Sequence, residues 1–389
     1  MQKQSSELPS ARTFNRFKII VLCLCISVGI LLLMQLQLFI SWDFRHGLWS
    51  PAYLLAHGKN PYGFGAPMQQ LRSVWFPMGI SLFMHLGWLD IYQASNVWMV
   101  LNIALVYATI LLAARRESLS PGFLIAALVL SFCSTSVLSH LGLGQFSLLA
   151  LVLYLVAAIL VNQGRIGASA VLIAIALTKP QLGILVVPGL FIRVWRDGRW
   201  RAAVMFFGAL TLSMFWFALS FWVIAPQWHQ DLFAITRATQ TWLQPALFRT
   251  LQLTFGELGL MLWGALTIGI FLLNAGMWFK LPARRAVSWS LALTALVSPY
   301  LWSWDFVLLL PALVDAASRF QLKITRVLFV LGGVLIEGMT MYIRLFTDNS
   351  DERFWWVPLA VFALIGSGYA FEYLARANFI PRKNDANPL

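Results

Sequence analysis

Long apolar runs separated by short polar stretches follow one another along almost the whole chain. A helix needs about 20 apolar residues to cross the hydrocarbon core of a bilayer, and open strands cannot cross it. The pattern therefore predicts an all-α polytopic membrane protein. We expect twelve membrane-spanning helices, at 19–41, 91–113, 121–138, 146–161, 166–178, 182–194, 202–225, 257–279, 286–300, 302–318, 325–343 and 354–375.

The apolar stretch 75–89 departs from this pattern because it is short and interrupted by Pro77, Gly79, His85 and Gly87. A run of that length more often dips into the bilayer or lies on its surface. We therefore do not count it as a span, and we place it in the first external loop.

Composition agrees with a membrane protein, and charge predicts its orientation. Only 11% of the residues are charged, against about 25% in a typical soluble domain. The net charge is +13, and most of the 28 Lys and Arg fall on one side of the expected spans, together with both termini. The positive-inside rule makes this side cytoplasmic. Because the basic residues lie at span ends, they favour membrane lipid headgroups as partners, and we expect no nucleic acid.

The expected organisation is a cytoplasmic tail at 1–18, a single transmembrane domain at 19–376 and a second cytoplasmic tail at 377–389. The three cysteines lie inside apolar runs, and the five histidines lack the spacing of a zinc site. The cytoplasmic loops contain no glycine-rich phosphate-binding loop. We therefore expect no metal and no cofactor.

The first external loop begins with "SWDFRHGLWSPAYLLAHGKNPYG", residues 41–63. Ser50 can cap a helix, Pro51 suits its first turn, and Gly58 suits its end. These signals predict a helix lying on the outer leaflet, with a second one following at 75–89.

Asp43 lies at the mouth of the first expected span, between two aromatic residues. Partial desolvation raises the pKa of a carboxyl group and makes its anion a better general base. Asp43 is therefore a candidate catalytic residue. The alternative is an ordinary interfacial aspartate that faces water.

Lys179, in "ALTKPQLG", lies between two apolar runs and directly before Pro180, which ends a helix. It falls on the less basic side of the membrane. A point charge at a helix break suits a phosphate group. The alternative is a lysine that extends along the helix to reach the interface.

Three further external stretches carry polar candidates. "SHLGLGQFS" contains His140 and Gln145, and its glycines permit close approach to a ligand. "SPYLWSWDF" places Asp305 beside Trp302 and Trp304, which could form an interfacial aromatic belt or a platform for a sugar. The loop 226–248 contains Arg237 and could cover a substrate or merely connect two spans.

Glu337 differs from these candidates because it lies within an expected span. A carboxylate inside the membrane is a functional candidate by default. It could equally pair with a neighbouring helix.

Taken in order, the Asp at the exit of the first span, "AYLLAHGKNPYG", "GQFSLLALVL", "ALTKPQLGILVVPGLF" and "VSPYLWSWDFVLLLPAL" resemble the alpha-mannosyltransferase-like family of polytopic bacterial enzymes, glycosyltransferase family 87. The resemblance covers roughly residues 40–315. It implies a GT-C-type bundle of about 12 transmembrane helices with juxtamembrane helices in the first external loop. Asp43 matches the acidic catalytic base of that loop, and Lys179 matches the lysine before proline. "SWDFRHG" stands where many such enzymes have Tyr and Ala, which leaves the substrate open.

The resemblance implies an inverting hexosyltransferase of the bacterial inner membrane whose active site faces outside the cytoplasm. The donor would be a polyprenyl-phosphate sugar, with mannose as the expected hexose, and the acceptor a lipid or a glycan. We assign donor-phosphate binding to Lys179, Arg45 and Arg237. We assign substrate binding to His46, Tyr62, His140, Gln145, Gln181, Trp302 and Asp305.

Two other functions compete with this one. A transporter or flippase of a lipid-linked sugar should show paired halves with broken, charged helices at the bilayer midplane. No such repeat is visible, and the charged residues gather at one face. A structural membrane subunit would not need an ordered first loop that carries Asp, Arg and His.

Overall fold

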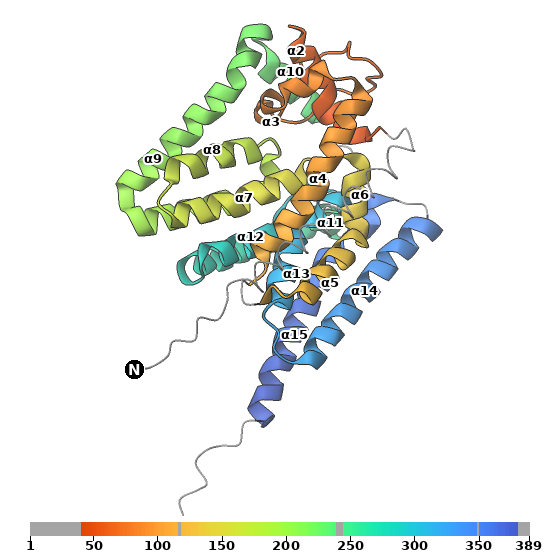
Figure 1. Ribbon diagram of the computed structural model, residues 1–389, viewed down its shortest axis with the longest axis vertical. Helices are drawn as coiled ribbons and strands as arrows, with labels where there is room; N and C mark the ends of the chain where they lie inside the picture. Colours follow the sequence, from red (N-terminus) through yellow and green to blue (C-terminus); the bar gives the residue numbers. More distant parts are fainter. Residues whose placement is uncertain (1–39, 116–117, 239–243, 348–349, 380–389) are drawn as a thin grey trace, which may run out of the picture.

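The computed structural model describes residues 40–115, 118–238, 244–347 and 350–379, which form helices joined by mostly short connections, the long one at 57–76 excepted (Figure 1). Among these residues, five helical stretches are long and apolar enough to cross a membrane. They are α4 (Ile91–Ala113), α9 (Val186–Ile224), α11 (Leu247–Lys280), α14 (Lys323–Phe346) and Asp351–Ala377, which includes most of α15 (Val357–Phe379). A sixth results if α5 (Pro121–Phe132) and α6 (Thr135–Leu143), bent by 64° at their junction, count as one. The chain is an integral membrane protein with an all-helical described part.

The expectation of twelve separate spans is not confirmed, since the described residues provide five or six. The expected first span, 19–41, lies almost entirely outside the described residues, as does the tail 1–18. The expected spans 182–194 and 202–225 are the two halves of α9, which is broken where Arg199 adopts a left-handed φ of 54°. The break separates α9 into two helices, and the rings of Phe191 and Phe207, on either side of it, lie 4.9 Å apart.

Two other expected spans, 286–300 and 302–318, are short internal helices instead. They correspond to α12 (Ala283–Val297), followed by η6 (Ser303–Leu309) and α13 (Leu310–Ala317). The longest of these has 15 residues and is about 22 Å long, against a hydrocarbon core of about 30 Å. Most of α12 is buried by other helices, so its apolar composition reflects protein packing.

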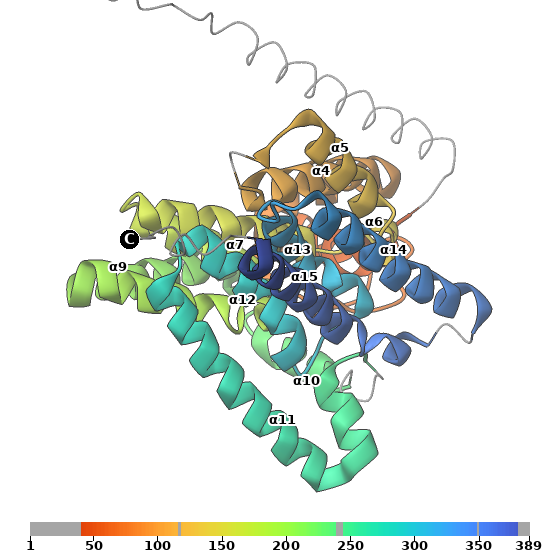
Figure 2. The same cartoon turned by 90° about the horizontal axis from the view of Figure 1, so that it is seen from below.

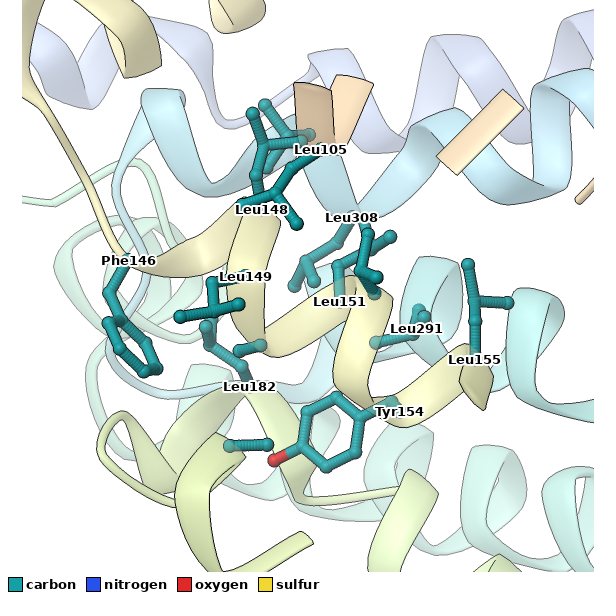
Figure 3. Packing of buried hydrophobic residues seen from close by; sticks show 14 of the residues in the cluster. Leu105, Phe146, Leu148, Leu149, Leu151, Tyr154, Leu155, Leu182, Leu291 and Leu308 are labelled. Atoms are coloured by element: carbon teal, nitrogen blue, oxygen red, sulfur yellow. The ribbon is translucent and has the colours of Figure 1, made fainter. Parts of the chain in front are cut away.

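The helix α7 (Ser147–Asn162) lies at the centre of the bundle, and its side chains meet four other elements (Figure 3). Leu148, Leu151 and Leu155 are fully buried. Their surroundings come from α4, α12, η6 and η4 (Pro180–Gly183), the elements that carry Leu105, Leu291, Leu308 and Leu182. Three fully buried alanines let neighbouring helices approach α7 closely: Ala150, Ala157 and Ala158. This packing holds in place the chain segments that enter and leave α7 and α8 (Ile166–Ala176).

The segment that the sequence predicts to be external gathers at one end of the molecule, beside the start of α4 (Figure 1). It contains η1 (Phe44–Trp49), α2 (Ser50–Ala56), α3 (Pro77–Leu82), η2 (Met84–Trp88) and, from later in the chain, α10 (Trp228–Ala238). The stretch 75–89 thus forms two short helical pieces, neither long enough to cross a bilayer. Asn60 ties the segment to α10 by donating to Asp231 at 2.8 Å.

The predicted cap of the first surface helix was wrong. The helical run begins at Trp42, so Ser50 lies inside it and its backbone N–H donates to the carbonyl of Arg45. The Ser50 hydroxyl is buried and caps nothing. The end was predicted correctly, because Gly58 follows α2 with a left-handed φ of 67°.

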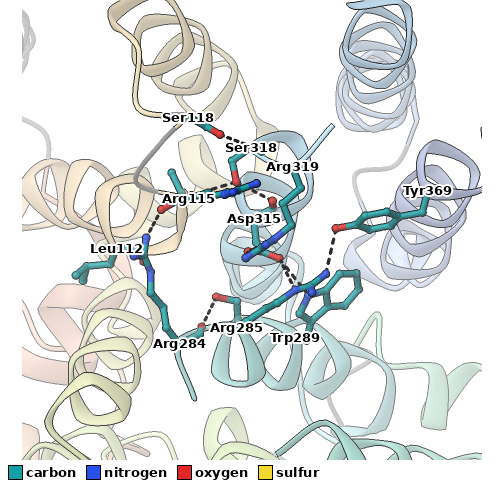
Figure 4. Close-up of polar contacts among 12 residues, drawn as sticks. Leu112, Arg115, Ser118, Arg284, Arg285, Trp289, Asp315, Ser318, Arg319 and Tyr369 are labelled. Atoms are coloured by element: carbon teal, nitrogen blue, oxygen red, sulfur yellow. Dashed lines mark hydrogen bonds and ion pairs between the residues drawn. The ribbon is translucent and has the colours of Figure 1, made fainter. Parts of the chain in front are cut away.

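At the other end of α4, a cluster of arginines holds α4, α12 and α13 together (Figure 4). Arg284 donates to the carbonyls of Leu112 and Ala114, at the end of α4. The buried Asp315 of α13 pairs with Arg285 at 3.2 Å and with Arg319 at 2.8 Å. These contacts satisfy a buried carboxylate and tie α12 and α13 to α4. In the view from below, α11 projects away from this packed centre (Figure 2).

Candidate active site

Four side chains from distant parts of the chain form one hydrogen-bonded network. Gln145 Nε2 donates to Asp43 Oδ2, and Gln145 Oε1 accepts from Lys179 Nζ at 2.6 Å. Lys179 Nζ is also 3.1 Å from Asp305 Oδ1, in an ion pair. The structure therefore brings together Asp43, Gln145, Lys179 and Asp305, which the sequence suggested as separate candidates.

Each of these residues lies at an interruption of regular α-helix. Asp43 directly precedes η1, and Gln145 lies between α6 and α7. Lys179 lies between α8 and η4, and Asp305 belongs to η6. Such breaks inside a membrane protein are tolerated where surrounding protein satisfies the backbone or where they line a cavity.

Gly144 sets the spacing between Asp43 and Gln145. It ends α6 with a left-handed φ of 68°, which favours glycine. A Cβ at this position would lie 2.6 Å from the Cβ of Phe44 and 2.7 Å from that of Ser41. The buried Trp98 donates from Nε1 to the Gly144 carbonyl at 2.8 Å. The close approach of the end of α6 to the start of η1 therefore requires glycine at position 144.

The Lys179 ammonium uses all of its hydrogen-bonding capacity within the protein. Its three acceptors are Gln145 Oε1, Ser147 Oγ at 3.3 Å and Asp305 Oδ1. An ammonium has three N–H donors. Direct binding of a donor phosphate by Lys179 would therefore require one of these partners to leave, and Ser147 is the most distant.

The Gln145 amide has only one orientation that fits its neighbours. Its NH2 group faces the Asp43 carboxylate, and its carbonyl faces the Lys179 ammonium. The reverse orientation would place oxygen against oxygen and N–H against N–H. Gln145 thus bridges Lys179 and Asp43 and orients the Asp43 carboxylate relative to the Lys179 ammonium.

The pKa of Asp43 is raised to about 6, mainly because burial disfavours the charged carboxylate. The Lys179 cation lowers this pKa, the Asp305 anion raises it, and the hydrogen bond from Gln145 lowers it. Asp43 is half-buried, and its Oδ1 accepts no hydrogen bond from the described residues. A carboxylate with one oriented oxygen and one open oxygen has the geometry of a general base.

Three predicted site residues of the external segment have structural contacts. His46 Nδ1 donates to the Trp42 carbonyl at 2.8 Å, and its Nε2 accepts from the Gln70 backbone at 3.1 Å. Both ring nitrogens are thus occupied, and burial lowers the pKa of His46, so the ring is neutral. Tyr62 is buried and donates from its hydroxyl to the Trp75 carbonyl at 2.7 Å. Both residues hold the returning part of the loop against η1.

Arg45 is the third. Its side chain is largely buried, its guanidinium lies 4.8 Å from the centre of the Trp42 ring, and its Nε has no hydrogen-bond partner in the described part. Arg45 is two residues after Asp43 in a helical run, where side chains at this spacing do not face each other, so its contacts in the described part leave it outside the network.

The remaining predicted residues lie outside the network or only border it. His140 is fully buried and bonds through Nε2 to Asn102 Oδ1 at 3.1 Å. Gln181 is half-buried in η4 with no hydrogen bond to the described residues, and Arg237 is exposed on α10 beside the Phe233 ring. Trp302 donates from its backbone to Asp305 Oδ2 at 3.2 Å.

Trp302 also stacks on Trp304, with ring centres 4.9 Å apart and planes inclined by 7°. The Nε1 of Trp304 is buried and has no hydrogen-bond partner in the described part. The two indoles therefore border the network at Asp305, where the sequence alone left a belt and a sugar platform as equal alternatives.

Two residues of the site were missed. Ser147 donates to Asp305 Oδ1, and Trp75 lies over the Lys179 ammonium at 5.6 Å from its ring centre. Ser147 ends the "GQFS" motif and could have been included, but Trp75 looked like part of an apolar run. The backbone explains its position, because Phe76 N donates to the Thr178 carbonyl at 3.0 Å.

Glu337 pairs with a neighbouring helix, which was one of the two interpretations that the sequence left open. Its Oε2 accepts from the backbone N–H and the hydroxyl of Thr135, each at 2.9 Å. Thr135 begins α6, so Glu337 of α14 caps the helix that leads to Gln145. Among the described residues, no group of three His, Cys, Asp or Glu side chains is placed to hold a metal ion.

Long apolar helices around a buried, charged network define an integral membrane protein with a candidate catalytic centre. The family model Glycosyltransferase family 87 matches residues 76–311, which is more than half of the chain. The chain belongs to this family and is a membrane glycosyltransferase. The matched region contains Gln145, Lys179 and Asp305, whereas Asp43 precedes it. No curated protein matches the chain.

Proposed function

We propose that the enzyme transfers a hexose, mannose on the family resemblance, from a polyprenyl-phosphate sugar to a lipid or glycan acceptor. The reaction takes place on the outer face of the membrane and inverts the anomeric carbon. The observation that carries the proposal is the Asp43 carboxylate, whose Oδ1 is open while Oδ2 is oriented by Gln145.

In the proposed reaction Asp43 accepts the proton of the acceptor hydroxyl. The hydroxyl oxygen forms a bond to the anomeric carbon as the bond from that carbon to the phosphate oxygen breaks. The polyprenyl phosphate leaves with the bonding electrons. Attack and departure occur on opposite faces of the sugar, so one displacement inverts the configuration.

The departing phosphate gains negative charge and needs a cation nearby. Arg45 is a candidate for this role because its Nε is buried and has no partner among the described residues. Lys179 remains a second candidate if the phosphate replaces Ser147 at the ammonium. Arg237, exposed on α10, is available for the part of the donor that lies outside the network.

A lipid-linked donor fits the proposed location of the site. In the proposed orientation the network lies at the external end of the bundle, where a polyprenyl chain can remain in the membrane while its phosphate reaches the protein. Nucleotide sugars are scarce outside the cytoplasm, so they are the less suitable donor there.

The test uses the purified enzyme in proteoliposomes with a radiolabelled polyprenyl-phosphate mannose and extracted envelope lipids as acceptors. Transfer of label to a new lipid or glycan by the wild type, and its loss in Asp43→Asn, supports the proposal. Movement of the labelled donor across the bilayer without transfer would instead favour a flippase.

A further inference from the structure

A cavity of about 610 Å³ lies between α5, α13, α14 and α15. Its walls are mainly apolar, with Phe123, Leu313 and Val361 among them. Leu130 and Val334 line it and are exposed, so the cavity opens between α5 and α14. An apolar cavity that opens toward the bilayer is suited to a hydrocarbon chain.

Two charged residues of α14 mark a length along the cavity. Arg326 and Glu337 both line it, and the lining continues on α14 to Met341. The 11-residue interval from Arg326 to Glu337 spans about 16 Å along a helix that rises 1.5 Å per residue. One leaflet of the hydrocarbon core is about 15 Å thick, half of about 30 Å. The stretch from Arg326 to Glu337 is therefore about as long as one leaflet is deep.

The end at Arg326 carries unpaired positive charge. Lys323 and Arg326 are one turn apart at the start of α14, and both are exposed. Arg326 donates from Nε to the Phe320 carbonyl, and its terminal nitrogens have no partner among the described residues. Lys323 has no partner there either. The positive-inside rule predicts that this end faces the cytoplasm.

We propose that the cavity binds one acyl chain of an anionic phospholipid from this leaflet, with its phosphate at Lys323 and Arg326. The chain end would lie near Glu337, whose Oε2 is already engaged by Thr135. The lipid is a component of the folded protein and is distinct from the sugar donor, which the proposed reaction uses at the outer face.

The bound chain would also support the catalytic network. Phe306 and Val307 line the cavity and directly follow Asp305 in η6. Val137 of α6 lines it too, two residues after Thr135, the start of the helix that Glu337 caps. A chain that fills the cavity would thus pack against η6, which carries Asp305, and against α6, which leads to Gln145.

The experiment is native mass spectrometry of the delipidated full-length protein, titrated with phosphatidylglycerol or with phosphatidylcholine in detergent. Gly333 lines the cavity, and a Cβ built on it meets no atom within 4 Å, so Gly333→Leu introduces a side chain into the space without a clash at its Cβ. Gly269 of α11 is equally open but lies outside the cavity, so Gly269→Leu is the matched control. Lys323→Gln and Arg326→Gln test the headgroup site.

We expect one tightly bound phosphatidylglycerol on the wild type and on Gly269→Leu, and at least about tenfold weaker binding to Gly333→Leu. Each headgroup variant should weaken binding about fivefold, as for a basic residue near an anionic lipid surface. Phosphatidylglycerol should raise the unfolding temperature of the wild type but not of Gly333→Leu, and all variants should unfold alike without lipid.

Equal binding of phosphatidylglycerol by Gly333→Leu and by its control would overturn the proposal. So would tighter binding of phosphatidylcholine than of phosphatidylglycerol. Recovery of a polyprenyl lipid from the cavity would assign it to the substrate instead. Because lipid binding is measured without sugar transfer, these outcomes are independent of the proposed reaction.

Discussion

Lys179 and Asp305 form a buried ion pair, with Nζ 3.1 Å from Oδ1 and side-chain exposures of only 7% and 0%. Desolvation makes such a pair a weak source of stability, but removing one partner leaves an uncompensated buried charge that is destabilising by about 3–5 kcal/mol. A single substitution in this pair therefore changes folding as well as chemistry. Its interpretation requires the double variant as a reference.

Asp43→Asn should retain the fold and donor binding and lose sugar transfer. Asparagine keeps the size of the side chain but cannot accept the acceptor proton, and general-base catalysis contributes about 10²–10⁴-fold. Turnover of the purified variant in proteoliposomes measures the loss, and equilibrium binding of the labelled donor provides the control. Turnover of Asp43→Asn within about threefold of the wild type would exclude Asp43 as the base.

Lys179→Ala should weaken apparent donor affinity if the ammonium exchanges Ser147 for the donor phosphate. Lys179→Arg should restore it only in part, because a guanidinium differs from an ammonium in shape and reach. Donor titrations of both variants measure this effect. The variant Lys179→Met/Asp305→Asn removes both charges and separates loss of binding from loss of folding; unchanged donor affinity in Lys179→Ala would exclude the phosphate role.

Activity should rise with pH through about 6, where Asp43 loses its proton, and fall about tenfold per pH unit below it. Lys179 lowers the pKa of Asp43 and Asp305 raises it. Lys179→Met should therefore shift the acid limb of kcat/KM to higher pH, and Asp305→Asn should shift it to lower pH. Profiles that move in the same direction in both variants would contradict this electrostatic coupling.

Gly144→Ala should reduce activity strongly, since its Cβ would collide with Phe44 and Ser41 and displace the start of η1. The left-handed φ adds strain for any residue with a Cβ, about 1–2 kcal/mol. Gly142→Ala, two residues earlier in the same helix, meets no atom within 4 Å and is the control. Equal activity of the two variants would show that the approach of α6 to η1 is not needed.

The orientation can be tested in a variant whose three cysteines are replaced by alanine. Lys59→Cys in the external segment should react with a membrane-impermeant maleimide in intact cells. Arg165→Cys, exposed between α7 and α8, should react only after the membrane is opened. The reverse pattern would place the active site on the cytoplasmic side.

The sequence by itself determined the class of protein and the ends of several elements. Apolar runs without charge cannot be stable outside a membrane or a large core, and α4 was predicted at 91–113, where the structure has it. Pro180 and Gly58 mark chain breaks because their backbone restrictions are local. Asp43, Gln145, Lys179 and Asp305 were each identified as candidates from their immediate neighbours.

Only the tertiary structure decided how many apolar segments face lipid and which polar groups meet. Lipid tails are as apolar as leucine, so hydropathy cannot separate the buried α12 from a lipid-facing span such as α11. The links from Asp43 to Gln145 and from Lys179 to Asp305 join residues more than 100 positions apart. Such pairs are selected by the packing of helices around α7, since local sequence does not encode which distant helix breaks will meet.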